Sequence, residues 1–120
     1  MAESNITKAK SLSFAVRIVK LYKHLCDDHR EFVLSKQCLR SGTSIGAMVR
    51  EAEYAQSKSD FIHKLSIGSK EANETLYWLE LLFETRYIDA ASYESIKADA
   101  DELLKLLTAS IKTAKANLSK

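Results

Sequence analysis

Hydrophobic residues recur every three or four positions in four stretches of the chain, which is the spacing of a helix with one apolar face. This periodicity predicts helices over residues 6–28, 36–56, 58–85 and 90–118. No stretch of four to eight residues alternates apolar and polar side chains in the manner of a strand. The sequence therefore predicts an all-α chain.

The predicted core consists of the apolar rows of these helices. The first helix carries two adjacent rows, which are Leu12, Ala15, Val16, Val19, Tyr22 and Cys26, and beside them Phe14, Ile18, Leu21 and Leu25. The rows of the later helices are Cys38, Gly42, Ile45, Val49 and Ala52; Phe61, Leu65, Gly68, Ala72, Leu76, Leu79 and Phe83; and Tyr93, Ile96, Ala100, Leu103, Leu107, Ile111, Ala114 and Leu118. We expect the two rows of the first helix to form one wide apolar face.

Residues that break helices are scarce, since the chain has no proline and only three glycines. The predicted N-caps of the later helices are Ser35, then Ser57 or Ser59, and finally Asp89. Helices of this length extend about 30–40 Å at 1.5 Å per residue. Short loops between long helices favour antiparallel neighbours. We expect one domain, residues 1–120, folded as an antiparallel up-down-up-down four-helix bundle.

Composition places the chain among folded globular proteins, with 46% hydrophobic and 28% charged residues. No window approaches the roughly 18 consecutive apolar residues of a membrane-spanning helix, and the start of the chain has no export signal. The two cysteines, Cys26 and Cys38, are too few for a disulfide framework and are expected to be small apolar core residues. These features predict a soluble cytoplasmic protein without a membrane partner.

The net charge of +2 is unevenly distributed along the chain. Residues 1–30 carry +3 and residues 31–58 carry +1, whereas residues 59–88 carry −2 and residues 89–120 are neutral. A basic first half is an indication of nucleic-acid contact, although it is short of a basic stripe. The candidate phosphate-binding residues are Arg17, Lys20, Lys23, Arg40, Arg50, Lys58 and Lys64.

Residues 42–46 match the GxSxG pattern that surrounds the nucleophile of α/β-hydrolases. That chemistry requires a strand before the serine, but the residues before Gly42 continue a helical pattern. The better interpretation is close packing, because two glycines inside a helix each cost about 1 kcal/mol relative to alanine. We expect Gly42 and Gly46 to face the first or third helix, with Trp78 or Tyr22 as the partner. The sequence therefore predicts no enzyme and no small-molecule substrate.

Asp60 and His63 are three residues apart and could offer two metal ligands from one helix face. A di-iron bundle needs a second such pair and further glutamates, and the chain has no second pair. We therefore expect no metal and no cofactor.

Polar side chains flank the core rows of the second and third predicted helices. Arg50 is placed to pair with Glu71 or Glu74 across the seam between them, since a guanidinium group can fork onto a carboxylate. Arginine and aromatic residues with few lysines are also typical of subunit interfaces. The candidate helix-packing or subunit-interface residues are Gly42, Ser44, Gly46, Arg50, Glu51, Glu71, Glu74 and Trp78.

Two separated blocks carry a resemblance to a known family. The string LRSGTSIGA at residues 39–47, with VREA at 49–52, and the second block, DFIHKL at 60–65 and KEANETLYWL at 70–79, together resemble the four helix bundle proteins also called 23S ribosomal RNA intervening-sequence proteins. The likeness covers nearly the whole chain. Met48, where a polar residue is expected, and Gly68, where alanine is more usual, depart from the pattern.

The resemblance implies an antiparallel four-helix bundle that assembles into a ring, typically a homopentamer, and a proposed role in binding RNA. The family fold is also similar to an accessory bundle protein of diversity-generating retroelements. We therefore expect a non-enzymatic homo-oligomer that binds RNA or DNA or assists a nucleic-acid enzyme. The alternative is a protein-interaction scaffold with no nucleic-acid ligand.

Overall fold

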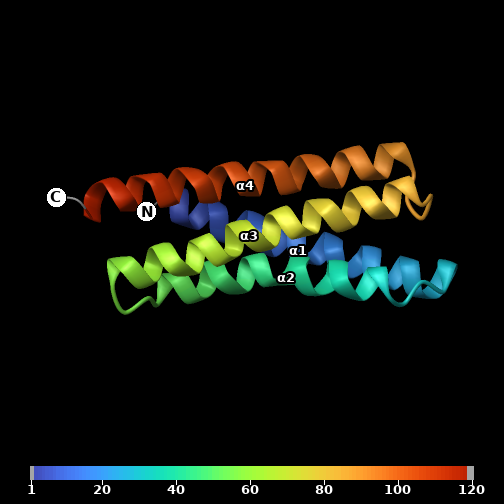
Figure 1. Cartoon of the computed structure of the whole chain (residues 1–120), viewed down its shortest axis with the longest axis horizontal. Coiled ribbons are helices and arrows are strands. Elements are labelled where there is room, and N and C mark those ends of the chain that lie inside the picture. Colours follow the sequence, from blue (N-terminus) through green and yellow to red (C-terminus); the bar gives the residue numbers. More distant parts are fainter. Residues whose placement is uncertain (1, 119–120) are drawn as a thin grey trace.

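The computed structural model describes residues 2–118, with side chains from residue 5 onward. Four helices occupy almost all of this range: α1 (Ala2–His29), α2 (Leu34–Glu53), α3 (Lys58–Glu84) and α4 (Ala90–Leu118). They run alternately up and down and are joined by short loops (Figure 1). No strand occurs in residues 2–118. The predicted all-α four-helix bundle is confirmed.

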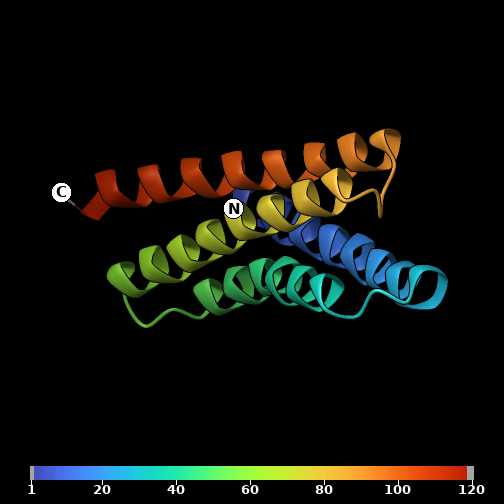
Figure 2. The same cartoon turned by 45° about the vertical axis from the view of Figure 1, so that its right-hand side comes forward.

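The four helices form a square in which each packs against its sequence neighbours and α4 returns to α1. The backbones of the diagonal pairs, α1 with α3 and α2 with α4, do not approach each other closely within the described chain. The rod measures 52 × 22 × 20 Å. The contact between α1 and α4 is the least extensive, because α1 begins beside α4 and diverges from it toward the α1–α2 loop (Figure 2).

The start of α2 differs from the prediction. The helix begins at Leu34, and the carboxylate of Glu31 accepts hydrogen bonds from the backbone N–H groups of Val33, Leu34 and Ser35 at 2.7–3.1 Å. Ser35 lies inside the first turn, where its hydroxyl donates to the Glu31 carbonyl. The prediction of Ser35 as N-cap was therefore wrong, because a carboxylate three residues upstream satisfies the free N–H groups of the helix start.

The starts of α3 and α4 follow serine and aspartate caps. The Ser57 hydroxyl accepts the Asp60 N–H at 3.0 Å, and the Asp60 carboxylate accepts the Gln56 N–H in return. The Asp89 carboxylate accepts the Ser92 N–H at 2.7 Å. The hydrogen bonds from Ser92 lower the pKa of Asp89, since they stabilise its charged form.

The core corrects the expectation for the first helix. The row containing Phe14, Ile18 and Leu25 supplies the fully buried side chains, since each of these three is at most 1% exposed. In the other row, Leu12 is 53% and Val16 46% exposed, and the rest of that row is partly buried. The square arrangement leaves α1 only two neighbours, so a face as wide as both rows cannot be covered within one chain. In the later helices, the large apolar side chains of near-zero exposure are Ile45, Leu79, Leu82, Leu103 and Leu107, and Ala72 and Ala100 are equally buried.

The two glycines of α2 both face α1. A Cβ on Gly42 would lie 2.8 Å from Cγ1 of Ile18, and one on Gly46 would lie 3.4 Å from Oγ of Ser11. Close packing at the glycines and the first helix as partner were therefore correct expectations. The expected partner side chains, Trp78 and Tyr22, were wrong.

Candidate nucleic-acid and subunit interfaces

The separation of α1 from α4 leaves an open groove along one edge of the bundle. Two adjoining hollows of about 350 and 560 Å³ occupy it. Apolar side chains of Leu21, Ile88 and Ile96 lie along the groove. Cationic and imidazole groups border it, namely Arg17, Lys20, His24, His29 and Arg86. The groove therefore combines an apolar floor with a basic border.

Rings also meet in this groove. His24 and His29 contact each other edge to face with centroids 5.0 Å apart, and His29 meets Tyr87 in the same way at 5.8 Å. Acidic groups also lie at the border, since Asp28 contacts Nδ1 of His24 at 2.6 Å and Asp89 lines the same hollow. Aromatic rings beside cations are the groups on which unpaired bases of a single strand stack.

The cations predicted to bind phosphate fall into two sets. Arg17 donates to Asp99 at 2.7 Å, and Lys64 pairs with Glu51 at 3.1 Å. A phosphate at either position would have to displace a carboxylate. Arg40 is engaged in the same manner by two glutamates of α3. The other set, Lys20, Lys23, Arg50 and Lys58, is exposed and forms no ion pair within the described residues.

The seam between α2 and α3 contains the predicted ion pair but with another arginine. Arg40 donates through Nη1 to Glu71 at 3.3 Å and through Nη2 to both carboxylate oxygens of Glu74. The expectation that Arg50 makes this contact was wrong, because it lies ten residues, about 15 Å, further along α2. Arg50 instead lines a shallow hollow with Tyr54 and Lys64 near the end of α2.

Below this pair the seam is closed by polar and aromatic side chains. The Thr75 hydroxyl donates to that of Ser41 at 2.9 Å, and both residues are fully buried. Trp78 meets the exposed ring of Tyr77 edge-on at 5.0 Å, and its indole N–H is buried without an acceptor among the described residues. The seam is thus a structural contact between two helices of one chain, with its arginine and glutamates reaching solvent.

The GxSxG segment lies within helix α2 from end to end. Ser44 donates its hydroxyl hydrogen to the backbone carbonyl of Arg40 at 2.7 Å. This geometry differs from the strained strand-to-helix turn that exposes a hydrolase nucleophile. His63 is exposed on α3, and the described residues contain no group of three or more His, Cys, Asp or Glu arranged to hold a metal ion.

Sequence reasoning missed the groove, although some of its residues were singled out. Arg86 and the two histidines near the α1–α2 loop are far apart in sequence, and they meet only because α1 and α3 end at the same end of the bundle (Figure 1).

Among residues 2–118, no helix is long and apolar enough to cross a bilayer.

The molecule is therefore a four-helix bundle whose distinctive chemistry lies on its outer faces and in an edge groove. Residues 3–109 match the profile of the 23S rRNA-intervening sequence proteins, and the chain belongs to that family. It is also similar to a solved structure from Bacteroides thetaiotaomicron, described as a protein of unknown function from the S23 ribosomal protein family. The two share 63% identity over 92% of this chain and 98% of the other, with a TM-score of 0.91. No curated protein sequence matches the chain significantly.

Proposed function

We propose that this protein is a non-enzymatic, self-associating module of the cytoplasm that binds single-stranded RNA along the groove between α1 and α4. The observation that carries the proposal is the groove itself, where Lys20 and Arg86 border an apolar floor beside the rings of His29 and Tyr87. Membership of a family described by 23S rRNA intervening sequences supports RNA as the ligand. Accessory action on a nucleic-acid enzyme is compatible with the same surface.

Self-association is supported by the uncovered apolar row of α1. Leu12 and Val16 are about half exposed and stand one helical turn apart. Lys20 follows one further turn along the same side, with Lys23 beside it. A contact through the aliphatic part would therefore bring cations of neighbouring copies close together. The family resemblance favours five copies in a ring, and repetition of a weak site strengthens overall binding through valency.

The test is a titration of a fluorescent single-stranded RNA at several salt concentrations. The variant Lys20→Glu/Arg86→Glu, which changes two cations of the groove, is compared with Lys105→Glu/Lys112→Glu, two exposed lysines of α4 that also lie in no ion pair among the described residues. Both variants change the net charge by the same amount. Loss of two phosphate contacts lowers the slope of log affinity against log salt by about 1.4. Equal weakening by both variants, or no binding at low salt, contradicts the proposal.

The alternative function is a protein-interaction scaffold, which the exposed ring of Tyr54 near Arg50 favours. In that case Arg50→Glu breaks the oligomer in sedimentation analysis, and RNA fails to bind at any salt concentration. Under the RNA proposal, Leu12→Asp/Val16→Asp separates the subunits instead, while Lys20→Glu/Arg86→Glu leaves assembly intact. The two sets of variants therefore distinguish the functions.

A further inference from the structure

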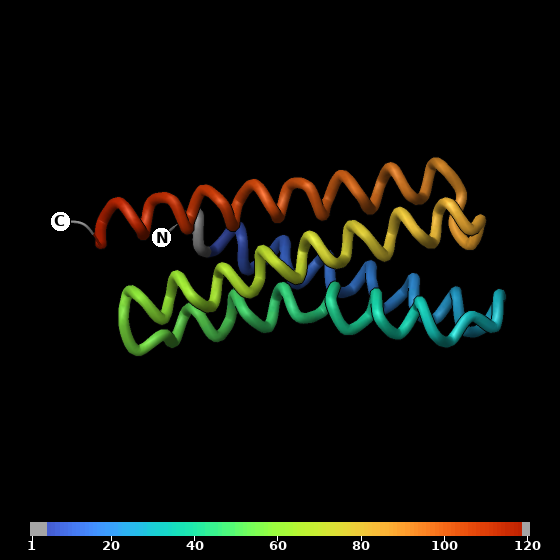
Figure 3. Tube along the Cα trace, viewed as in Figure 1, coloured from blue at the N-terminus to red at the C-terminus, as the bar shows by residue number. Residues whose placement is uncertain are grey.

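The end of the bundle opposite the basic groove contains a second cavity, and the register of α1 against α4 explains it. Lys10 pairs with Glu102 at 3.1 Å, which sets the first turns of α1 level with the middle of α4. The last turns of α4 therefore continue beyond the start of α1 (Figures 1 and 3). At that end the bundle has three walls in place of four.

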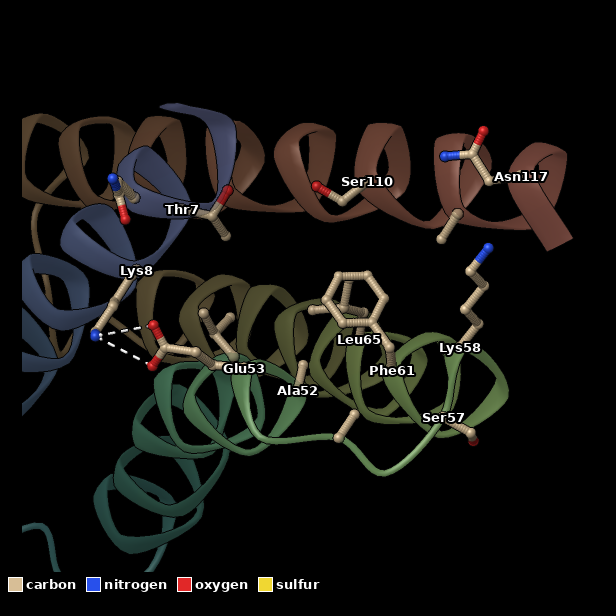
Figure 4. A pocket seen from close by; sticks show the side chains of 14 residues that line it. Thr7, Lys8, Ala52, Glu53, Ser57, Lys58, Phe61, Leu65, Ser110 and Asn117 are labelled. Atoms are coloured by element: carbon tan, nitrogen blue, oxygen red, sulfur yellow. Dashed lines mark hydrogen bonds and ion pairs between the residues drawn. The ribbon is translucent and has the colours of Figure 1, made fainter. Parts of the chain in front are cut away.

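The cavity has a volume of about 560 Å³, within the range of small-ligand sites in proteins. Val49, Ala52, Phe61, Leu65 and Ala114 supply its apolar wall. Small side chains on α2 and α4 leave this space unfilled, and Phe61 projects from α3 into the space beneath α4 (Figure 4). The ion pair of Lys8 with Glu53 closes one side at 3.1 Å.

The polar groups of the cavity indicate the class of ligand. Asn5, Ser110 and Asn117 line it, and their side chains bond to no other described residue. A side-chain amide both donates and accepts, as the edge of a nucleobase does. A purely aliphatic ligand would bury these groups without partners, which is unfavourable.

A cation completes the site. Lys58, in the first turn of α3, extends toward Asn117 across the mouth and forms no ion pair with another described residue (Figure 4). Its ammonium group stands where an anion attached to a ring on Phe61 would lie. An aromatic face, free amides and a cation at the rim together suit a heteroaromatic anion.

We propose that this end cavity binds one nucleotide, with its base against the ring of Phe61 and its phosphate at Lys58, beside Asn117. The nucleotide is either a free monophosphate or one unit of a bound RNA strand, and in the latter form the inference rests on the proposed function. The site is separate from the groove between α1 and α4, so each can be tested alone.

The first measurement titrates the wild-type protein with AMP, GMP, CMP and UMP, followed by amide chemical shifts. Shifts are expected for residues of the cavity. Phe61→Tyr keeps an aromatic ring and should retain binding, whereas Phe61→Leu should weaken it about tenfold, as loss of base stacking does. Lys58→Gln should weaken AMP binding and leave adenosine binding unchanged. Thermal melts by circular dichroism check that each variant is folded.

The second measurement separates the two sources of the nucleotide. If RNA supplies it, Phe61→Leu weakens RNA binding about tenfold relative to Phe61→Tyr, and AMP competes. If only free nucleotides occupy the cavity, AMP binds but neither variant changes RNA affinity. Nucleotide binding that is identical in the leucine and tyrosine variants, or absent at millimolar concentration, overturns the inference. RNA binding that persists in that case leaves the proposed function standing.

Discussion

The three glycines of the chain provide a sharp test of the packing, because the same substitution should have opposite effects at two of them. All three lie inside helices and have ordinary negative φ angles. Replacement by alanine therefore gains about 1 kcal/mol of helix propensity at each position. What differs is the space available for the added methyl group.

At Gly42 the new Cβ would lie 2.8 and 2.9 Å from Cγ1 and Cγ2 of Ile18. Both atoms are attached to a branched Cβ and cannot rotate away independently. Overpacking in a core costs about 1–3 kcal/mol, so Gly42→Ala should be neutral to destabilising by about 2 kcal/mol. At Gly68 the nearest atom is Cβ of Met48 at 3.5 Å, an ordinary contact. Gly68→Ala should therefore stabilise by up to about 1 kcal/mol.

The assay is urea unfolding followed by far-UV circular dichroism and by the fluorescence of Trp78, the single tryptophan. Protein concentration is held constant, because association changes apparent stability. The double variant Ile18→Ala/Gly42→Ala removes the clashing atoms. It should be more stable than additivity predicts by about 1–2 kcal/mol. Equal shifts for Gly42→Ala and Gly68→Ala, or strict additivity in the double variant, would refute the proposed contact between Gly42 and Ile18.

Three further predictions concern local features of the structure. Burial raises the pKa of Glu31, but hydrogen bonds from the start of α2 outweigh this effect, and the net shift of the pKa is downward. Glu31→Gln should therefore lower the free energy of unfolding by about 1–3 kcal/mol at pH 7. In urea titrations, the difference in stability between this variant and the wild type should be fully present above the pKa of Glu31 in the unfolded chain. It should shrink as the pH falls through the lower pKa of Glu31 in the folded protein. Burial raises the pKa of the Cys38 thiol to about 12, so iodoacetamide at pH 8 should label Cys26 first, as peptide mapping can show. Ser57→Ala should cost about 1 kcal/mol in thermal melts through loss of the α3 cap, whereas Ser59→Ala should change little.

The architecture was predictable from the sequence, because the helical period of the apolar residues and the length of the periodic stretches are compatible with few folds. Four periodic stretches without proline can bury their apolar helix faces only by packing side by side, and short connections make neighbouring helices antiparallel. The caps at Ser57 and Asp89 followed from local chemistry. Glu31 was missed because a carboxylate can act as a cap only when the preceding loop turns it back onto the helix, as the left-handed Arg30 (φ 52°) precedes it here.

The candidate surface was less predictable, since it depends on how the rods are inclined and staggered. Helical periodicity gives the direction of a side chain around its own axis, but not which residue of the next helix lies level with it. The sequence therefore indicated an arginine–glutamate contact between α2 and α3, but the predicted arginine was Arg50, whereas Arg40 makes the contact. The two positions lie about 15 Å apart along the axis of α2. The groove between α1 and α4 arises from the inclination of these helices, and the end cavity arises from their stagger.

The glycines show the same limit at the level of a single methyl group. Gly42 and Gly68 both lie on predicted core rows, and both are buried, so the pattern assigns them the same role. Only the crossing of α2 over α1 distinguishes them, because it brings Ile18 onto Gly42, whereas α2 and α3 leave room beside Gly68. Met48 faces Gly68 across that seam at an ordinary contact distance, so an added methyl group is tolerated there. The α1–α2 contact at Gly42 is the position at which a larger side chain would separate the helices.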